Sequence, residues 1–262
     1  MRFQHSAALR AAFPDLVAGV LVATGVTKEL AVAPRVDQFT GQARARLATG
    51  PEAGFPEIRA WRRAFAATGL RPTQYRCAAE ALLRRLRLDG EMPRLHPLVD
   101  LCNAISVAYA LPVAVLDTDR ISGDLTVRHA DGDEEYVTFG GGVERPDPGE
   151  VTYADEAGRA HARRWTNRQS GWSAVRAETS RVLIVAEGLH ATAAEDVARL
   201  VETLRAELTG VGAVPTAGAV LTGSAPAVEV PEERSAGPTS RPDSDAGRPG
   251  PGQAVSPGAR WR

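Results

Sequence analysis

Lysine and long apolar runs are scarce in this sequence. Of the 31 basic residues only Lys28 is a lysine, and an arginine excess beside so many alanines, glycines and prolines is typical of a GC-rich genome, so it is weak evidence for phosphate binding. No window approaches the roughly 18 consecutive apolar residues of a membrane helix. Residues 1–15 lack the apolar stretch and cleavage site of a signal peptide. We therefore expect a cytoplasmic protein with no membrane partner.

Side chains for metal binding or covalent catalysis do not fall into recognisable spacings. Cys77 and Cys102 lie in apolar, helix-like surroundings without a CxxC spacing, which favours packed free thiols over a disulfide or a zinc pair. The five histidines are scattered, and no HxxxH or HxxEH spacing brings two of them to one helix face. There is also no GxSxG elbow to present a nucleophilic serine. We predict neither a metal nor a cofactor.

The glycines of FGGGVERP, residues 139–146, do not predict a phosphate cradle. Such a cradle needs a strand, a loop and then a helix whose N-terminus meets the anion. Here the glycines follow one apolar run of strand character and precede another. A hairpin or loop explains them better.

The remaining pattern predicts an α+β domain. With 44% hydrophobic and 24% charged residues, the chain has the composition of a globular protein. Alternating or apolar short runs predict strands at 16–26, 112–117, 125–130, 135–140, 150–155, 159–165 and 180–188. Helical spacing predicts helices at 37–47, 57–67, before Gly90, from His96 to Pro112, and at 192–210, where Thr192 and Glu195 form a capping box. Grouped strands between helices favour α+β over repeated βαβ units.

The last fifth of the chain differs from the rest in composition. From about residue 210 it is crowded with Gly, Pro, Ser and Ala and has almost no aromatic residues. Such a segment cannot bury enough apolar surface to offset the entropy lost on ordering. We therefore predict a folded domain at 1–210 and a disordered tail at 211–262.

Charge is distributed in blocks. Eight arginines face Glu80 alone between Arg59 and Leu88, and six arginines face Glu178 alone in 159–181, with an acidic block between the two. The two basic blocks predict one positive surface if the fold brings them together, although solvated faces of amphipathic elements explain the charges equally well. Arg76, Arg84 and Arg85 are the candidate RNA contacts of the first block.

The second block contains RRWTNRQSGW, which interleaves arginines, amides and indoles. These groups suit stacking on exposed bases and hydrogen bonding to phosphates and sugars. The pattern indicates a nucleic-acid role, with a structural strand-and-loop network as the alternative.

Several segments together resemble a known family. They are RCAAEALLRRL, LVDLCNAISVAYALPVAVLDTDRISGDLTVRHADGDEEY, GEVTYADEAGRAHARRWTNRQ and ETSRVLIVAEG. They resemble the B3/B4 domain of the phenylalanyl-tRNA synthetase β subunit, and still more its free-standing relatives, over about 73–188. The resemblance implies a three-layer α+β domain with mixed sheets flanked by helices. It also implies an editing site that hydrolyses the ester at the 3′ end of a mischarged tRNA, typically a tyrosyl ester.

The resemblance places the family's pocket asparagine at Asn103, where it would orient the amino group or the water. Thr179 matches a family threonine, and Ala114 stands where synthetases usually carry a histidine. The family's GGE segment is replaced by 164–171, so the acidic pocket residue has no counterpart. Two interpretations of Asn103 stay open: it faces a cleft, or it hydrogen-bonds backbone in a buried helix. Thr179 has a turn-capping role as its alternative.

Within 164–171 we assign further roles from the chemistry of the side chains, as a deacylase would need them. Arg164 or Arg168 would hold the terminal phosphates, and Trp165 would stack on the terminal adenine. Gln169 is a candidate hydrogen-bond donor, and Asn167 a further substrate contact. We expect Asn103, Trp165 and Arg168 to converge on one cavity.

Three functions follow, and the sequence does not choose among them. The first is a free-standing deacylase that hydrolyses mischarged tRNA in trans. The second is a tRNA- or aminoacyl-binding module without catalysis, which the missing histidine and glutamate favour. The third is a pocket for a free amino acid, without RNA. The expected partner is the aminoacylated 3′ end of tRNA, with no role for DNA; the amino acid, the tRNA and the oligomeric state are left open.

Overall fold

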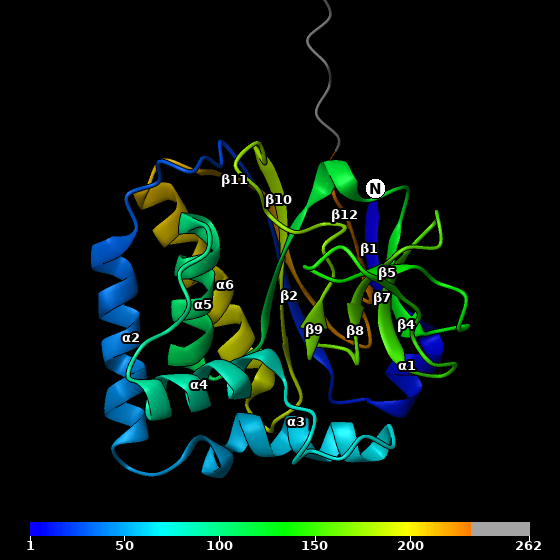
Figure 1. Ribbon diagram of the computed structural model, residues 1–262, viewed down its shortest axis with the longest axis horizontal. Helices are drawn as coiled ribbons and strands as arrows, with labels where there is room; N and C mark the ends of the chain where they lie inside the picture. The colour runs from blue at the N-terminus through cyan, green and yellow to red at the C-terminus, as the bar shows by residue number, and fades with distance from the viewer. Residues whose placement is uncertain (232–262) are drawn as a thin grey trace, which may run out of the picture. The chain divides into compact units, whose positions relative to one another are not determined.

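A layer of helices, a four-stranded sheet and a six-stranded sheet make up the fold (Figure 1). The computed structural model describes residues 1–231. Its helices are α1 (Ala7–Ala12), α2 (Ala33–Leu47), α3 (Pro56–Ala67), α4 (Ala78–Asp89), α5 (Pro97–Tyr109) and α6 (Ala193–Gly210), with 3₁₀ turns η1 (Glu52–Gly54) and η2 (Thr118–Arg120). Its strands are β1 (Arg2–His5), β2 (Val17–Thr24), β3 (Val113–Asp117), β4 (Leu125–His129), β5 (Tyr136–Val137), β6 (Val143–Glu144), β7 (Val151–Asp155), β8 (Ala160–Arg163), β9 (Arg168–Gln169), β10 (Arg181–Gly188), β11 (Val214–Leu221) and β12 (Ala227–Glu229). The predicted three-layer α+β fold is confirmed.

The four-stranded sheet is the middle layer. Its order is β11-β2-β10-β3, and every pair is antiparallel. Because side chains alternate along a strand, Leu21 and Ile184 pack toward the helices, whereas Val20 and Val185 pack toward the second sheet. Burial on both faces explains why the central strands are almost continuously apolar.

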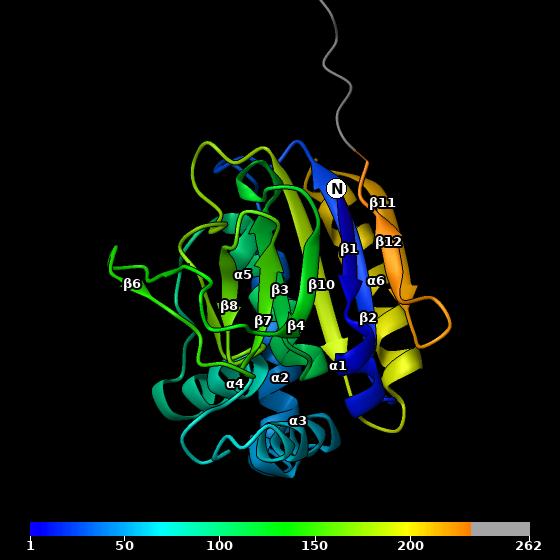
Figure 2. The ribbon, with the colours of Figure 1, turned by 90° about the vertical axis from the view of Figure 1, so that its right-hand side faces the viewer.

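The six-stranded sheet closes the other side of the core (Figure 2). Its order is β12-β1-β4-β7-β8-β9; β1 and β4 are parallel and the other pairs antiparallel, so the sheet is mixed. Phe3, Val127 and Tyr153 face the four-stranded sheet across a shared core. The predicted hairpin around the three glycines is present, since Val137 pairs with Val143, and its β6 segment projects away from the sheets in Figure 2.

The helix ends follow local chemistry, with two differences from expectation. Gly90 ends α4 in the left-handed region at φ 81°, as its position predicts. However, α5 ends at Tyr109, before Pro112, because Ala110 adopts φ 55°. The predicted capping box at the start of α6 is wrong: the Thr192 hydroxyl donates to Asp196 Oδ2 at 2.6 Å and does not cap the backbone.

The predicted tail begins too early. Residues 214–221 form β11, which pairs with β2, and residues 227–229 form β12, which pairs with β1. Both are edge strands whose side chains are mostly half-buried or exposed, so they need few aromatic residues. The part of the predicted tail at 232–262 lies outside the described residues.

Two further expectations concern single features. Cys77 and Cys102 are buried free thiols, as predicted, and burial raises the pKa of each to about 12. Among the helices of residues 1–231, none has the length and apolarity that crossing a membrane requires.

Candidate functional site

The turn between β8 and β9 has an unusual backbone. Arg164 and Trp165 are consecutive non-glycine residues with φ of 49° and 60°. Residues held in this region cost about 1–3 kcal/mol each and persist only where the surroundings determine them. Here Glu150 Oε1 accepts from the Arg164 N–H at 2.7 Å, and the Trp165 N–H donates to the Val151 carbonyl at 2.7 Å.

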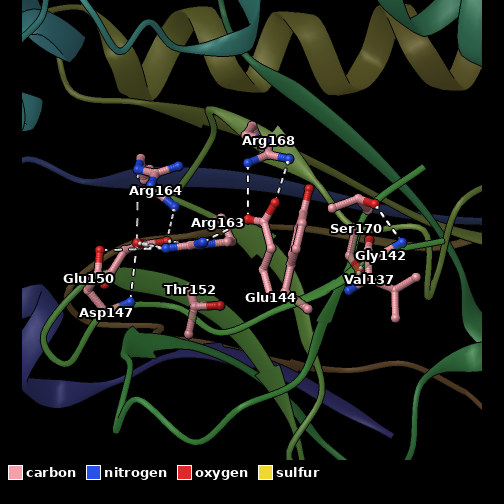
Figure 3. A network of polar contacts seen from close by, with 12 residues as sticks. Val137, Gly142, Glu144, Asp147, Glu150, Thr152, Arg163, Arg164, Arg168 and Ser170 are labelled. Atoms are coloured by element: carbon pink, nitrogen blue, oxygen red, sulfur yellow. Dashed lines mark hydrogen bonds and ion pairs between the residues drawn. The ribbon is translucent and has the colours of Figure 1, made fainter. Parts of the chain in front are cut away.

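A network of ion pairs fixes both strands that flank this turn (Figure 3). The Arg163 guanidinium donates to Glu150 at 3.0 and 2.8 Å and to Glu144 at 2.8 Å. Arg168 donates to Glu144 at 3.2 Å, which ties β9 to the hairpin. Burial opposes the charge of Glu144, but hydrogen bonds from Arg163 and Arg168 outweigh it and lower the pKa of Glu144. The turn is therefore preorganised by charged groups that sequence spacing alone does not pair.

Trp165 is part of the core, so the predicted stacking of its ring on adenine is wrong. Its side chain is 1% exposed. The indole packs edge-on against Trp61 at 4.9 Å and Phe13 at 5.0 Å between ring centroids. Its Nε1–H donates to the two Glu187 carboxylate oxygens at 3.1 and 3.2 Å.

Glu187 is a buried carboxylate between the sheets. Besides the indole it contacts His5 Nε2 at 2.7 Å and accepts from the Tyr153 hydroxyl. Burial first, and then the charge and hydrogen bond of Glu187, raise the pKa of Tyr153 well above its usual value. Glu187 thus links β10, β1, β7 and the strained turn.

A cavity of about 60 Å³ lies where these elements meet. It is lined by Ala78, Pro112, Val113, Ala114, Leu116, Tyr153, His161, Ala162, Trp165, Thr166, Asn167, Arg168, Gln169 and Val185. Ala114 and Val185 come from the four-stranded sheet, and Tyr153 and Ala162 from the six-stranded sheet. The cavity reaches the surface beside the exposed Arg168. We therefore take this cavity as the candidate binding site.

One wall contains a chain of buried hydrogen bonds. His161 Nδ1 is 2.8 Å from the Ser173 hydroxyl, and His161 Nε2 is 3.1 Å from Asp155 Oδ2. Burial opposes the charge of Asp155, but hydrogen bonds from His161 and from the backbone N–H groups of Ser122 and Arg159 outweigh it and lower the pKa of Asp155. Since Ser173 is fully buried and does not line the cavity, these residues hold the loop after β9 and do not form a catalytic triad.

Two half-buried amides, Asn167 and Gln169, line the cavity on either side of the exposed Arg168 in the chain, and we call this part of the lining its mouth. Asn167 Nδ2 donates to the Arg76 carbonyl, and Gln169 Nε2 donates to the Val115 carbonyl, each at 2.7 Å. A backbone carbonyl can accept only from the NH₂ group, so each amide has a defined orientation. The remaining oxygens, Asn167 Oδ1 and Gln169 Oε1, have no hydrogen-bond donor among residues 1–231.

Asn103 does not join Trp165 and Arg168 at the cavity, so the predicted convergence is wrong for this residue. It lies on α5, which packs on the other face of the four-stranded sheet. Thr179 is also outside the lining. Its hydroxyl donates to Asp117 Oδ2 at 2.7 Å and accepts from the Arg176 N–H at 2.9 Å, which is the turn-capping role.

Arg164 is the remaining predicted contact of this segment, and the structure places it away from the cavity. Its guanidinium lies over the Tyr75 ring, 4.6 Å from the centroid. Of Arg164 and Arg168, only Arg168 lines the cavity and stays a candidate for phosphate contact.

A larger groove of about 530 Å³ lies beside the cavity and was missed by sequence reasoning. Gln169 and Val115 line the groove, and Gln169 also lines the cavity. Its lining includes the exposed apolar side chains of Leu95 (70% exposed) and Phe139 (75% exposed), together with Lys28 and Arg176. The sequence does indicate that Phe139 is exposed, because an aromatic residue beside three glycines in a hairpin has little to pack against.

The predicted RNA-contacting arginines lie on or next to α4, which is adjacent to α3 (Figure 1). Arg76 is tied to the Thr73 carbonyl and to Glu80, and Arg85 pairs with Asp89 at 3.7 Å. The Arg84 side chain is exposed and makes no ion pair or hydrogen bond with the described residues. The side chains of Arg59, Arg63 and Arg71 likewise make no such contact with residues 1–231, and these arginines were not predicted individually.

A group of carboxylates away from the cavity has the spacing of a cation site. Asp131, Asp133 and Glu134 bring oxygens within 4.8 Å of one another. Glu134, however, already accepts from two backbone N–H groups at 3.0 Å and pairs with Arg128 at 2.7 Å. These contacts give Glu134 a structural role, because its carboxylate closes the turn.

Comparisons with known proteins bear on the family. A family model described as "B3/4 domain" matches residues 60–206. Among solved structures, an N-terminal fragment of the phenylalanyl-tRNA synthetase β-subunit from Pyrococcus horikoshii matches with 10% identity and a TM-score of 0.46, over 88% of this chain and 54% of that one. The chain thus spans about half of that fragment. A comparison with curated proteins gave no match.

Proposed function

This chain belongs to the B3/4 domain family, and on that premise we propose that it is a free-standing aminoacyl-tRNA deacylase that acts in trans on mischarged tRNA. The observation that carries the proposal is the pairing of a small apolar cavity with a larger groove, joined at Gln169. An aminoacyl-adenosine has the same two parts: a small amino acid and a larger nucleoside. The cavity would take the first and the groove the second.

The groove offers what a terminal adenosine needs. Bases stack on exposed aromatic rings, and Phe139 is such a ring. Lys28 and Arg176 line the same groove and supply positive charge for phosphates. Phe139 replaces Trp165 in the stacking role, because Trp165 is buried.

The ester itself would lie between the two spaces. Water adds to the ester carbonyl carbon, the bond to the ribose oxygen breaks, and the products are a free amino acid and a tRNA 3′-hydroxyl. Because the ester is already activated, binding and orientation supply much of the rate. The free oxygens of Asn167 and Gln169 would accept from the α-ammonium group, and Arg168 would donate to the developing oxyanion or to a phosphate.

The deacylase proposal is tested with purified protein and a panel of mischarged tRNAs. We expect loss of at least one ester faster than its spontaneous hydrolysis. If no ester is released faster than without protein, the catalytic proposal is wrong.

A second candidate, a binding module with the same fold, is favoured by one observation. Among the described lining residues, the imidazole nitrogens of His161 and the hydroxyl of Tyr153 are already hydrogen-bonded to other side chains. Neither is free to act as a general base. Saturable tRNA binding without turnover would identify this function.

We expect the exposed arginines of α3 and α4 to bind the tRNA backbone. Replacing Arg63 and Arg84 by glutamine should reduce the slope of log Kd against log salt by about 0.7–0.9 for each phosphate that is no longer neutralised. Arg205→Gln on α6, which pairs with Glu202 at 3.9 Å, is the matched control and should leave the slope unchanged. Equal slopes for the wild type and both variants would place the RNA on another surface. Binding of a free amino acid that does not depend on salt would instead favour the third function, an amino-acid pocket without RNA.

A further inference from the structure

Building on the proposed function, we propose that the amino acid removed is a small aliphatic one, of the size of valine, isoleucine or leucine, and not tyrosine. Two features of the cavity carry this inference: its volume and the state of its polar side chains.

The volume limits the side chain. About 60 Å³ is room for roughly four to six water molecules at 10–15 Å³ each, a small space for a large side chain. Valine has three side-chain carbons and leucine four, whereas tyrosine has eight heavy atoms. The walls are rigid, because Ala114 and Val185 are paired across two antiparallel strands and the Trp165 ring packs against the Trp61 ring.

The walls are mostly apolar, which disfavours a phenol. Ala114, Leu116, Ala162 and Val185 have side chains that present only carbon atoms. The Tyr153 hydroxyl is bound to Glu187, and both nitrogens of His161 are bound to other side chains. Of the lining hydroxyls, that of Thr166 is buried and has no hydrogen-bond partner among residues 1–231. A phenol hydroxyl in this cavity would therefore lose its water and gain at most this one partner, whereas an aliphatic side chain has no hydrogen bond to water to lose.

The mouth supplies recognition common to all amino acids. Asn167 and Gln169 each present an amide oxygen whose orientation is set by a hydrogen bond from the amide nitrogen to a backbone carbonyl. Two oriented acceptors suit an α-ammonium group, which has three donors. Discrimination therefore depends on the cavity and not on the mouth.

The inference is tested with one tRNA charged in turn with alanine, valine, leucine, phenylalanine and tyrosine. We expect the valyl or leucyl ester to be released at least tenfold faster than the tyrosyl ester, since even one methylene changes specificity by about 10–200-fold. A tyrosyl ester released as fast or faster would overturn the inference and leave the deacylase proposal intact.

A cavity-filling variant ties the preference to this cavity. Ala114→Leu should slow release of the leucyl ester at least tenfold and leave the alanyl ester within about twofold, because one methylene accounts for about 10–200-fold and alanine needs little of the space. Release of the alanyl ester also shows that the variant is folded. Ala11→Leu, on the exposed face of α1, is the matched control and should change neither rate. Equal slowing of both esters by Ala114→Leu, in a variant that melts at the wild-type temperature, would contradict the assignment.

A second measurement applies if no ester is hydrolysed, in which case the deacylase proposal fails by itself. Binding is then compared for two non-hydrolysable probes, the 3′-valylamido and 3′-tyrosylamido analogues of 3′-deoxyadenosine. Tighter binding of the valyl probe supports the inference for a binding module. Tighter or equal binding of the tyrosyl probe, or no binding of either, overturns it.

Discussion

Replacing Trp165 by alanine is expected to lower the free energy of unfolding by about 3–5 kcal/mol, the usual cost of removing a fully buried large aromatic side chain. The indole is 1% exposed and packs against two other aromatic rings. Its loss would leave a cavity and would also remove one donor to the buried Glu187. Urea unfolding followed by circular dichroism measures the change.

Trp172→Ala is the matched control for this prediction. Trp172 is half-buried, its indole donates to the Glu135 carbonyl at 3.1 Å, and Arg159 lies over its ring at 4.6 Å. We expect a loss of about 1 kcal/mol, the worth of one net hydrogen bond. Similar losses for the two variants would show that Trp165 is not the anchor of the β8–β9 turn.

Replacing Glu187 by leucine is expected to cost about 3–5 kcal/mol, because it breaks a buried polar cluster by removing one partner. His5, Tyr153 and Trp165 would then be buried without their shared acceptor. The effects of Glu187→Leu and Trp165→Ala should not add, with a coupling of about 0.5–3 kcal/mol, since the two residues share a hydrogen bond. The double variant and both single variants, unfolded in urea, give this coupling.

Glu178→Leu is the control for the glutamate. Glu178 is exposed and pairs with Arg120 at 3.3 Å, so its replacement should change stability by no more than about 0.5 kcal/mol. A loss below about 1 kcal/mol for Glu187→Leu would contradict the role we give to the cluster, because each unsatisfied buried group costs about 1–3 kcal/mol.

Much of the fold follows from local patterns. Apolar strands such as 181–188 and helices such as 78–89 are long enough for periodicity to identify them, and Gly90 marks a helix end by its freedom at positive φ. The edge strand at 214–221 was missed for the opposite reason. It contacts the sheet along one side, and its composition resembles that of a linker.

The site was harder to predict, because its contacts join residues far apart in the chain. The sequence points to the segment 163–172, but the Trp165 ring lies in the core, where Glu187, 22 residues later, accepts its indole N–H. Asn103 is assigned to a pocket by resemblance, yet it lines neither the cavity nor the groove, and of α5 only Pro97 and Val99, near its start, line the groove. No residue spacing in the sequence shows whether the side chains of Trp165 and Asn103 face a pocket or the core.

The location of the aminoacyl group is tested most directly by a crystal structure of the full chain with the 3′-valylamido analogue of 3′-deoxyadenosine. We expect the valyl side chain against Ala114 and Ala162 in the cavity, its ammonium group at Asn167 and Gln169, and the adenine on Phe139 in the groove. An analogue bound elsewhere on the protein, with the cavity between the sheets empty, would contradict both the site and the function proposed for it.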